Sequence, residues 1–261
     1  MEFVDTHCHI HFPDYPLDPE EVIADATKAG VTRLICVGCT LADSKLAVQF
    51  AAAHKNIWAA IGLHPHQASQ YVNDDLKLQK FGNLTQENGR DKIVAIGEIG
   101  LDYHYLHSPK ADQQKLLRFQ LDMAVEHNLP VIFHVRQAFD DFWQIYDEYS
   151  ARQPIRGVVH SFSAGTKELE QILQRDLYVG LNGIMTFTTD QNQLKAAKMM
   201  PLNRLLLETD APFLTPTPYR GTICQPKHVV ETAKFLSELR NEPLYELATI
   251  TSQNAKQLFN L

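Results

Sequence analysis

The chain alternates between short, almost continuous hydrophobic runs and longer stretches in which hydrophobic residues recur at helical spacing. Runs such as residues 33–37 and 130–134 are typical of parallel strands that are buried on both faces. The pattern predicts eight strands, at residues 2–6, 32–37, 57–62, 92–97, 130–134, 156–160, 177–181 and 204–208.

Local signals predict helices between these strands. Asp18 is followed by Pro19 and then Glu21, a combination of N-cap, first-turn proline and capping-box glutamate, and Gly30 predicts the end of that helix. Another helix is expected after residues 108–109, and two more near residues 226–239 and 242–258.

Eight β–α repeats in 261 residues predict an α/β protein with a (β/α)8 TIM barrel, a single domain over residues 1–261. A doubly wound open sheet is the alternative, because it produces the same alternation. No linker, low-complexity segment or long charge run marks a domain boundary.

Composition narrows the class of protein. The net charge of −7 argues against tight non-specific duplex binding, because proteins that bind through the phosphate backbone usually have a basic footprint. No hydrophobic run approaches the ~20 residues needed to cross a bilayer, and no secretory signal pattern is present at the N-terminus. We therefore expect a cytoplasmic protein with no membrane association and no obligate protein partner.

The four cysteines do not form a pattern typical of a zinc site. Cys36 and Cys39 have CxxC spacing but lie at the end of a predicted strand, and no second pair is present. We interpret them as packing residues, with a redox role as the alternative.

Metal-capable side chains recur where the predicted strands end, which is where barrel enzymes place their active sites. His7 and His9 are two residues apart at the end of the first strand, so both imidazoles face the same side. The other strand ends carry His64 and His66, Glu98 and Asp102, His134 and Arg136, His160, and Glu208 and Asp210.

Each of these residues has a simpler explanation when taken alone. Acids after a strand are frequent helix N-caps, and histidines are often satisfied core residues. Together, however, several buried polar groups without partners would cost roughly 2–7 kcal/mol each, and a metal removes that cost. Nitrogen and oxygen ligands suit Zn, Mn, Mg or Fe. Six candidate ligands are more than the three protein ligands of one catalytic zinc site. Two divalent metals with Glu98 as the bridge fit this number better.

The chain resembles the TatD family of metal-dependent hydrolases, part of the amidohydrolase superfamily of barrels, in motifs that follow one another along its whole length. These motifs are His7-Cys-His9, Gly97-Glu98-Ile-Gly-Leu-Asp102-Tyr103, Pro130-Val-Ile-Phe-His134-Val-Arg136, His160-Ser-Phe-Ser163, Glu208-Thr-Asp210-Ala-Pro-Phe-Leu and the closing residues 251–259.

The resemblance implies a two-metal centre. His7 and His9 would bind one metal with Asp210, His134 and His160 would bind the other, Glu98 would bridge, and His64 would lie beside the metals. Characterised relatives are often nucleases that remove nucleotides from DNA ends, so the resemblance implies DNA or another phosphodiester as substrate.

The chain departs from the family after its eighth strand. Many relatives read Arg-Gly-Lys-Arg-Asn-Glu-Pro there, whereas this chain keeps Arg220 but has Thr222 and Ile223 in place of the Lys-Arg pair. The loss of two positive charges near the expected substrate entrance weakens the inference to nucleic acid.

The mechanism we expect is metal-assisted hydrolysis, with Asp210 as the general base for the attacking water. Arg136 and Arg220 are candidates to hold an anionic group, and Tyr103 or His66 could stack on a base. An ordinary salt bridge is the alternative for Arg136, and loop packing is the alternative for Tyr103 and His66.

The leading function is a phosphodiesterase or deoxyribonuclease acting on DNA ends or single strands. One alternative is hydrolysis of a carboxylic ester or amide, including an aminoacyl ester on tRNA, and another is a non-catalytic metal-binding scaffold. A groove with aromatic and basic walls would favour nucleic acid, whereas a closed cavity would favour a small substrate.

Overall fold

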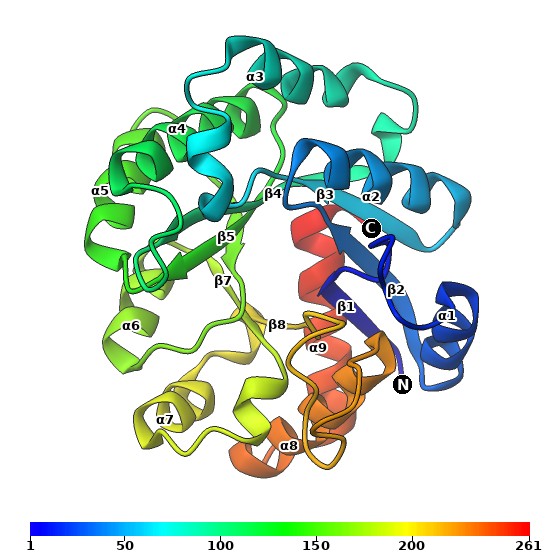
Figure 1. Cartoon of the computed structure of the whole chain (residues 1–261). Helices are drawn as coiled ribbons and strands as arrows, with labels where there is room; N and C mark the ends of the chain where they lie inside the picture. Colours follow the sequence, from blue (N-terminus) through cyan, green and yellow to red (C-terminus); the bar gives the residue numbers. More distant parts are fainter. The chain divides into compact units, whose positions relative to one another are not determined.

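The computed structural model describes residues 1–261, and eight strands alternate with helices along the chain (Figure 1). The strands are β1 (Phe3–Cys8), β2 (Val31–Val37), β3 (Ile57–Ile61), β4 (Ile93–Asp102), β5 (Val131–Arg136), β6 (Gly157–Val159), β7 (Tyr178–Leu181) and β8 (Leu205–Leu207). Every predicted strand is present, and the main difference is that β4 continues to Asp102 rather than ending at residue 97.

The helices occupy the stretches between the strands and the C-terminal part of the chain. They are α1 (Pro19–Lys28), α2 (Leu41–Ala53), α3 (Asp75–Gly82), α4 (Lys110–Glu126), α5 (Phe139–Ser150), α6 (Thr166–Gln174), α7 (Gln191–Met199), α8 (Val229–Arg240) and α9 (Leu244–Phe259). Short 3₁₀ turns include η1 (Pro65–Gln70), η4 (Gly183–Thr186) and η6 (Pro226–His228).

The start of α1 confirms the predicted capping signal. The Asp18 carboxylate accepts hydrogen bonds from the backbone N–H groups of Glu20 at 2.8 Å and Glu21 at 3.2 Å. These contacts satisfy two of the donors that the first turn of a helix leaves without a partner in the helix. The predicted helices after Pro109 and near the C-terminus are also present, as α4, α8 and α9.

The chain divides into two compact units. The first unit comprises Met1–Cys36 and Val159–Leu261, and the second unit comprises Val37–Val158. Nothing in this division tests whether residues 1–261 fold as one domain, so the single-domain expectation stays a prediction.

The first unit brings the two ends of the chain together in one parallel arrangement. β1 pairs with β2, with Cys8 opposite Cys36, and β7 pairs with β8, with Val179 opposite Leu205. β8 continues into a segment beside β1, where Cys8 and Ala211 form a parallel bridge. The strand order in the first unit is therefore β7-β8-β1-β2.

The second unit contains β3, β4, β5 and most of β6 in chain order. β3 pairs with β4, with Ala60 opposite Ala95, and β4 pairs with β5, with Gly97 opposite Ile132. All of these strands are parallel, so within each unit the carboxyl ends of the strands lie at the same edge of the sheet.

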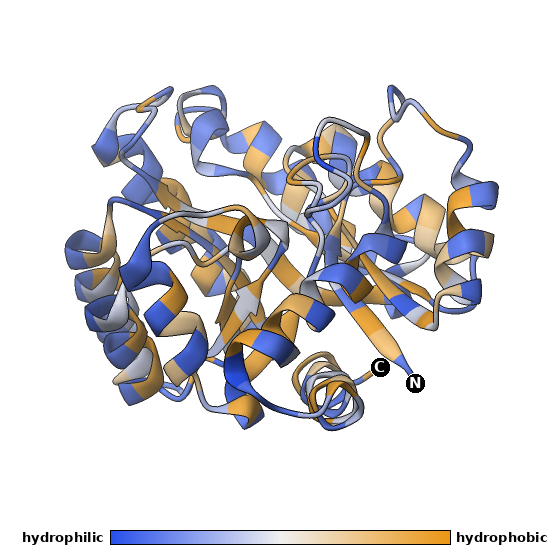
Figure 2. Ribbon diagram, turned by 90° about the horizontal axis from the view of Figure 1, so that it is seen from below, coloured by the Kyte–Doolittle hydropathy of each residue, from blue (hydrophilic) through white to orange (hydrophobic).

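Hydropathy follows the expected pattern, as Figure 2 shows: the strands are mostly hydrophobic, and the helices alternate hydrophobic and hydrophilic faces. Side chains in the strand centres, such as Ile35, Ile61, Ile96 and Phe133, are fully buried. Burial on both faces explains why these strands read as continuous hydrophobic runs.

Two further sequence expectations can be compared with the structure. No helix has the length and the apolar character that crossing a membrane requires. All four cysteines are free, and Cys8, Cys36 and Cys224 are buried. Of the CxxC pair, Cys36 is packed as expected, whereas Cys39 is half-buried, and a redox role for the pair stays untested.

Candidate metal centre

Each unit gathers candidate metal ligands at the carboxyl ends of its strands. In the first unit they are His7, His9, His160 and Asp210, here called the first cluster. In the second unit they are His64, Glu98 and His134, here called the second cluster. The structure thus brings every predicted metal ligand into one of two groups.

The first cluster has the spacing of a metal site. The Nε2 atoms of His7 and His9 are 3.2 Å apart, and they lie 3.6 Å and 3.3 Å from Asp210 Oδ1. Ligands held tetrahedrally at about 2.1 Å from a metal are about 3.4 Å apart. Two imidazole nitrogens and one carboxylate oxygen therefore fit a divalent ion of the zinc class, as the i, i+2 spacing predicts.

The backbone around Asp210 is constrained. Asp210 has a left-handed φ of 62°, a conformation that costs energy for most residues but that Asp tolerates better. Its N–H donates to His7 O at 2.8 Å, and the His9 N–H donates to Ala211 O at 2.7 Å. These two bonds fix the Asp210 carboxylate opposite the two imidazoles.

The buried carboxylate of Asp5 holds this turn in place through hydrogen bonds. Asp5, fully buried in β1, accepts hydrogen bonds from Thr209 N at 2.9 Å and from Thr209 Oγ1 at 2.6 Å. Burial raises the pKa of Asp5 well above its ordinary value, against the effect of these hydrogen bonds. Asp5 thereby positions the residue that precedes Asp210.

The imidazoles also set the ionisation of Asp210. Burial acts to raise the pKa of this carboxyl, but the hydrogen bond with His9 and the nearby His7 and His160 hold the pKa below its usual value. Asp210 is therefore ionised near neutral pH, as both a metal ligand and a proton acceptor need.

His160 completes the first cluster and has its own carboxylate partner. Its ring stacks on His7 with centroids 3.9 Å apart, and its Nδ1 lies 3.4 Å from Glu208 Oε1. A carboxylate behind a histidine fixes the orientation of the ring and leaves the other nitrogen for the metal. Gly180 makes room for this carboxylate, because a Cβ there would lie 2.3 Å from Glu208 Oε2.

The second cluster is centred on Glu98. His134 Nδ1 lies 2.6 Å from Glu98 Oε1, and His64 Nε2 lies 3.5 Å from the same oxygen. The far side of His134 is held by Asp102, whose Oδ2 is 3.0 Å from Nε2. His134 and His160 therefore share one arrangement, in which a buried carboxylate backs a histidine whose other nitrogen faces the cluster.

Glycine in β4 allows the strands that carry the second cluster to approach closely. Gly100 has a φ of 150° and lies opposite His134, and a Cβ there would be 1.9 Å from His134 O. Only glycine fits such an approach. The β4–β5 register therefore places His134 between Glu98 and Asp102.

Electrostatics keeps the second cluster ready for a cation. Burial lowers the pKa of His64 to about 4, despite the opposing effect of Glu98, so its imidazole is neutral at pH 7. Burial acts to raise the pKa of Asp102, but hydrogen bonds from His134 and the Tyr105 backbone hold it below its usual value. The neutral imidazole of His64 can therefore bind a metal, and the ionised Asp102 can orient His134.

The predicted substrate residues of the second unit divide into two groups. The Tyr103 hydroxyl donates to Asp141 at 2.8 Å and accepts from Gln114 at 2.9 Å, which favours loop packing over base stacking. Arg136 forms no ion pair, and its guanidinium lies 4.8 Å from the ring centroid of the exposed Tyr105. The salt-bridge alternative for Arg136 therefore finds no carboxylate partner.

His66 lies beside the second cluster rather than on the surface. Its Nε2 is 3.1 Å from Asp102 Oδ2, and its ring centroid is 4.3 Å from that of His64 and 5.7 Å from that of Tyr105. The His66 imidazole therefore lies between His64 of the second cluster and Tyr105 of the loop that follows β4.

In the first unit Arg220 stands beside another aromatic ring. Its guanidinium lies 3.8 Å from the ring centroid of Phe187, and Nη1 donates to Thr215 O at 2.8 Å. Arg220 is exposed and has no carboxylate partner. No carboxylate neutralises its charge, and the anion-binding role of Arg220 stays a prediction.

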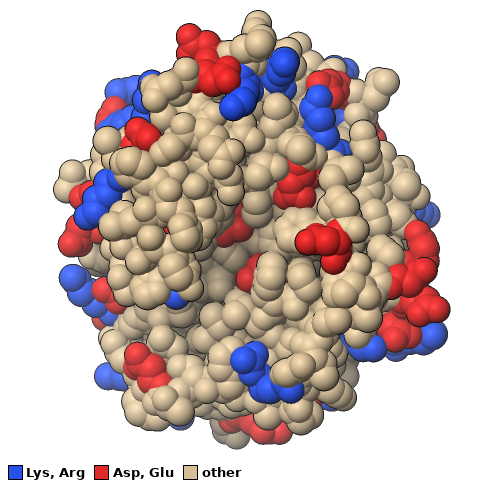
Figure 3. Space-filling view, in the orientation of Figure 1, with Lys and Arg blue, Asp and Glu red and all other residues tan.

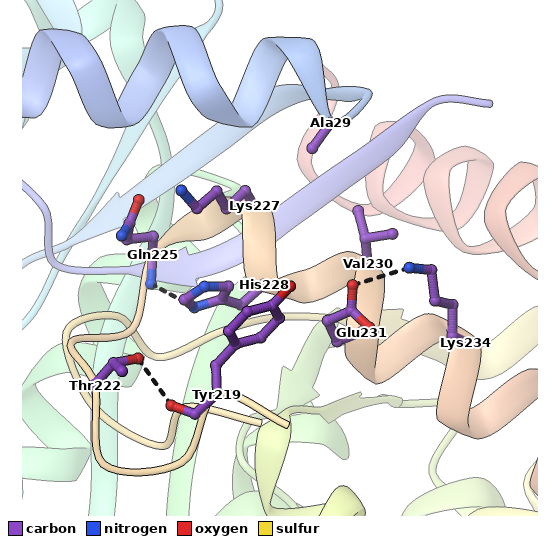
Figure 4. A pocket seen from close by; sticks show the side chains of 9 residues that line it. All are labelled: Ala29, Tyr219, Thr222, Gln225, Lys227, His228, Val230, Glu231 and Lys234. Atoms are coloured by element: carbon purple, nitrogen blue, oxygen red, sulfur yellow. Dashed lines mark hydrogen bonds and ion pairs between the residues drawn. The ribbon is translucent and has the colours of Figure 1, made fainter. Parts of the chain in front are cut away.

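A separate cavity of about 580 Å³ lies in the first unit, beside the loop that follows β8 (Figure 4). The Tyr219 ring stacks on His228 with centroids 5.0 Å apart, and Lys227 and Lys234 pair with Asp25 and Glu231. The balanced charges of this cavity give it no net preference for an anion, and none of its lining residues belongs to either cluster.

Surface charge agrees with the acidic composition. Figure 3 shows Lys and Arg interspersed with Asp and Glu on this face, without a continuous basic patch. This face therefore has no basic surface of the kind that binds the phosphate backbone of duplex nucleic acid.

Comparison with known proteins identifies the family. The sequence model of the family described as "TatD related DNase" matches residues 4–260. The chain belongs to the TatD family. It is 37% identical over 257 residues to YabD of Bacillus subtilis strain 168, covering 98% of both chains. It is also 33% identical over 265 residues to YcfH of Escherichia coli K12, covering 100% of this chain and 97% of the relative.

Both of these TatD relatives are described as uncharacterized metal-dependent hydrolases, and this chain is a metal-dependent hydrolase of the same family. The names leave open which bond is cleaved and how many ions are bound. The predicted family is therefore confirmed, and the predicted substrate is not decided.

Solved TatD structures confirm the fold class. The crystal structure of YjjV, a TatD homolog from E. coli K12, is 31% identical and covers 99% of this chain and 98% of that chain, with a TM-score of 0.91. A TatD-family hydrolase from Entamoeba histolytica, 24% identical with a TM-score of 0.90, covers 99% of this chain and 98% of its own and has the same fold. The chain is a (β/α)8 TIM barrel, and the doubly wound alternative is wrong.

Sequence reasoning did not assign the residues that support the ligands. Asp5, Asp102 and Glu208 act behind metal-facing groups, and their only signal is an acid within or directly after a hydrophobic run. The sequence also did not predict that Tyr105 and Phe213 are exposed, because a sequence does not show which rings reach solvent.

Proposed function

We propose that this TatD-family hydrolase is a two-metal phosphodiesterase that acts on DNA ends or single strands. The observation that carries the proposal is the spacing of the first cluster, where three ligand atoms lie 3.2–3.6 Å apart around a common point. Divalent ions would supply the Lewis acidity that hydrolysis of a phosphate ester needs.

Both clusters fit such ions by chemistry as well as by spacing. His7, His9 and Asp210 of the first cluster would hold one ion. The resemblance to the family adds His134 and His160 as ligands of the other ion, with Glu98 as the shared carboxylate. Nitrogen and oxygen ligands allow Zn, Mg or Mn.

Asp210 would act as the general base. Its lowered pKa keeps the carboxylate ionised, so Oδ1 or Oδ2 can accept the proton of the attacking water. The constrained turn at Asp210 orients this carboxylate before substrate binds, which limits reorganisation during the reaction.

Two exposed arginines, each against an aromatic ring, support a nucleic-acid substrate. Arg136 lies against Tyr105 in the second unit, and Arg220 lies against Phe187 in the first unit. Guanidinium groups match phosphate in a bidentate way, and exposed rings stack on bases. The acidic net charge fits a short contact of this kind rather than a long electrostatic groove.

Hydrolysis of labelled substrates by the metal-stripped protein tests the proposal. The protein is supplied separately with Mg, Mn, Zn and Co, and is given 3′- and 5′-labelled single-stranded DNA alongside a carboxylic ester reporter. We expect metal-dependent shortening of the DNA, and a fall of about 10²–10⁴-fold in turnover for Asp210→Asn with an unchanged circular dichroism spectrum.

The same experiment separates the alternatives. Ester turnover without DNA cleavage would show a carboxylic ester hydrolase and overturn the phosphodiesterase. Metal binding without turnover of either substrate would favour a scaffold. Full activity in Asp210→Asn would remove this residue from the role of base.

A further inference from the structure

The turn after Asp210 places an apolar ring in solvent beside the first cluster. Phe213 is 53% exposed, and it is the one exposed residue among the thirteen phenylalanines of the chain. Its ring centroid is 6.3 Å from that of His9, with the two planes inclined at 61°. The other twelve phenylalanines are buried or half-buried, and a phenyl ring, unlike the exposed tyrosines, has no hydroxyl for water to solvate, so the exposure of Phe213 calls for a specific reason.

Phe213 is held in this exposed position by the backbone. Its N–H donates to Asp210 O at 2.8 Å, and the Cys224 N–H donates to Pro212 O at 3.0 Å. Leu214, the next residue, has a left-handed φ of 57°. The ring is therefore presented by a fixed turn and not by a freely moving loop.

The neighbouring imidazole is fixed as well. Phe12 stacks on the His9 ring with centroids 4.7 Å apart and planes inclined at 23°. Phe213 approaches the same imidazole through an edge contact and leaves much of its own ring uncovered. A flat group bound there would lie directly beside a metal-facing side chain.

We infer that Phe213 is a stacking site for a nucleobase, namely the base of the nucleotide whose phosphate is cleaved at the first cluster. This inference rests on the proposed phosphodiesterase function and names one contact of its substrate. Base and phosphate are joined through a single sugar, so a phosphate beside His9 and Asp210 carries its base into the neighbourhood of Phe213. Stacking on a ring tolerates every base, because each base has a π face.

The test combines changes in the protein with changes in the substrate. Wild type and Phe213→Ala are assayed on single-stranded DNA with either a normal or an abasic residue at the terminal positions of each end. We expect Phe213→Ala to lower kcat/KM on normal DNA by about 5- to 150-fold, mainly through a higher KM. On abasic DNA the wild type should already show this loss, and Phe213→Ala should add nothing.

Matched variants separate stacking from structure. Phe213→Tyr keeps a ring and should retain the wild-type kcat/KM. Tyr245→Ala removes another exposed ring, at the start of α9, and should leave cleavage unchanged. A 5-iodouracil base at the end of a slowly cleaved phosphorothioate DNA should crosslink to Phe213 on irradiation with the divalent metal present, as peptide mass spectrometry would show.

The outcomes separate the stacking role of Phe213 from the proposed phosphodiesterase activity. If wild type cleaves DNA but Phe213→Ala loses the same factor on normal and abasic substrates, or loses nothing, the stacking site is wrong and the phosphodiesterase stands. Crosslinking that maps elsewhere has the same meaning. If wild type cleaves no DNA with any divalent metal, the phosphodiesterase and the stacking site are both overturned.

Discussion

At the scale of single residues, two candidate metal ligands, His134 and His160, are each oriented by a carboxylate on the side of the ring away from the cluster. Asp102 lies 3.0 Å from His134 Nε2, and Glu208 lies 3.4 Å from His160 Nδ1. In both histidines the other ring nitrogen is available to the candidate metal site. The sequence could indicate these candidate ligands because their type and position recur at strand ends. The carboxylates behind them depend on which side chains meet across strands.

Replacement of Glu208 by glutamine should weaken metal binding without changing the ligand set. The amide keeps the volume that Gly180 accommodates but loses the charge behind His160, so metal affinity should fall by about 10- to 100-fold. Isothermal titration with Zn or Mn measures this affinity. Glu238→Gln, at an exposed position of α8, is the control, and equal affinity in the two variants would contradict the role of Glu208.

At the scale of elements, β4 decides the geometry of the second cluster. Its hydrophobic pattern ends near Gly97, which is why the sequence predicts a strand over residues 92–97. Pairing with β5 nevertheless continues to Asp102 opposite Arg136. The extra residues include two acids, Glu98 and Asp102, and a glycine, which are rare in strands, so local propensity could not predict this part of β4.

Gly100→Ala should disrupt this strand. A Cβ at Gly100 would lie 1.9 Å from His134 O, and neither backbone can move without breaking the β4–β5 register, so unfolding should become easier by roughly 3 kcal/mol. Gly82→Ala, at the end of α3 where nothing lies within 4 Å, should change stability by about 1 kcal/mol at most. Urea denaturation compares the two, and equal midpoints would show that the close approach is tolerated.

The start of α8 should make stability depend on pH. His228 Nδ1 accepts a hydrogen bond from the Gln225 N–H at 3.1 Å, and burial together with Lys227 lowers the pKa of His228 from 6.5 to about 4. Between pH 6.5 and 4 the unfolded chain therefore binds a proton that the native chain does not. Stability from this residue is complete above pH 6.5 and is lost as the pH falls toward 4.

Urea midpoints measured from pH 7 to pH 4.5 test this dependence. His228→Asn should reduce the slope of unfolding free energy against pH by up to one proton in this window. An unchanged slope in His228→Asn would show that this imidazole titrates alike in both states.

At the scale of the whole molecule, each of the two compact units contributes one cluster. The alternation of strands and helices made the barrel predictable, because buried parallel strands and capped helices follow local rules. The substrate was less predictable, because rings and guanidinium groups such as Tyr105 and Arg136 meet only after folding. The number of divalent ions bound per chain therefore tests whether these clusters bind metal.

The most direct measurement is the number of divalent ions bound per chain, determined by elemental analysis together with DNA cleavage. Wild type should bind two ions, and a variant without His7 and His9 should bind about one and cleave no DNA, as should a variant without His64 and His134. Wild type that binds no metal, or variants that keep both ions and full activity, would contradict the central claim that these clusters form the catalytic metal centre.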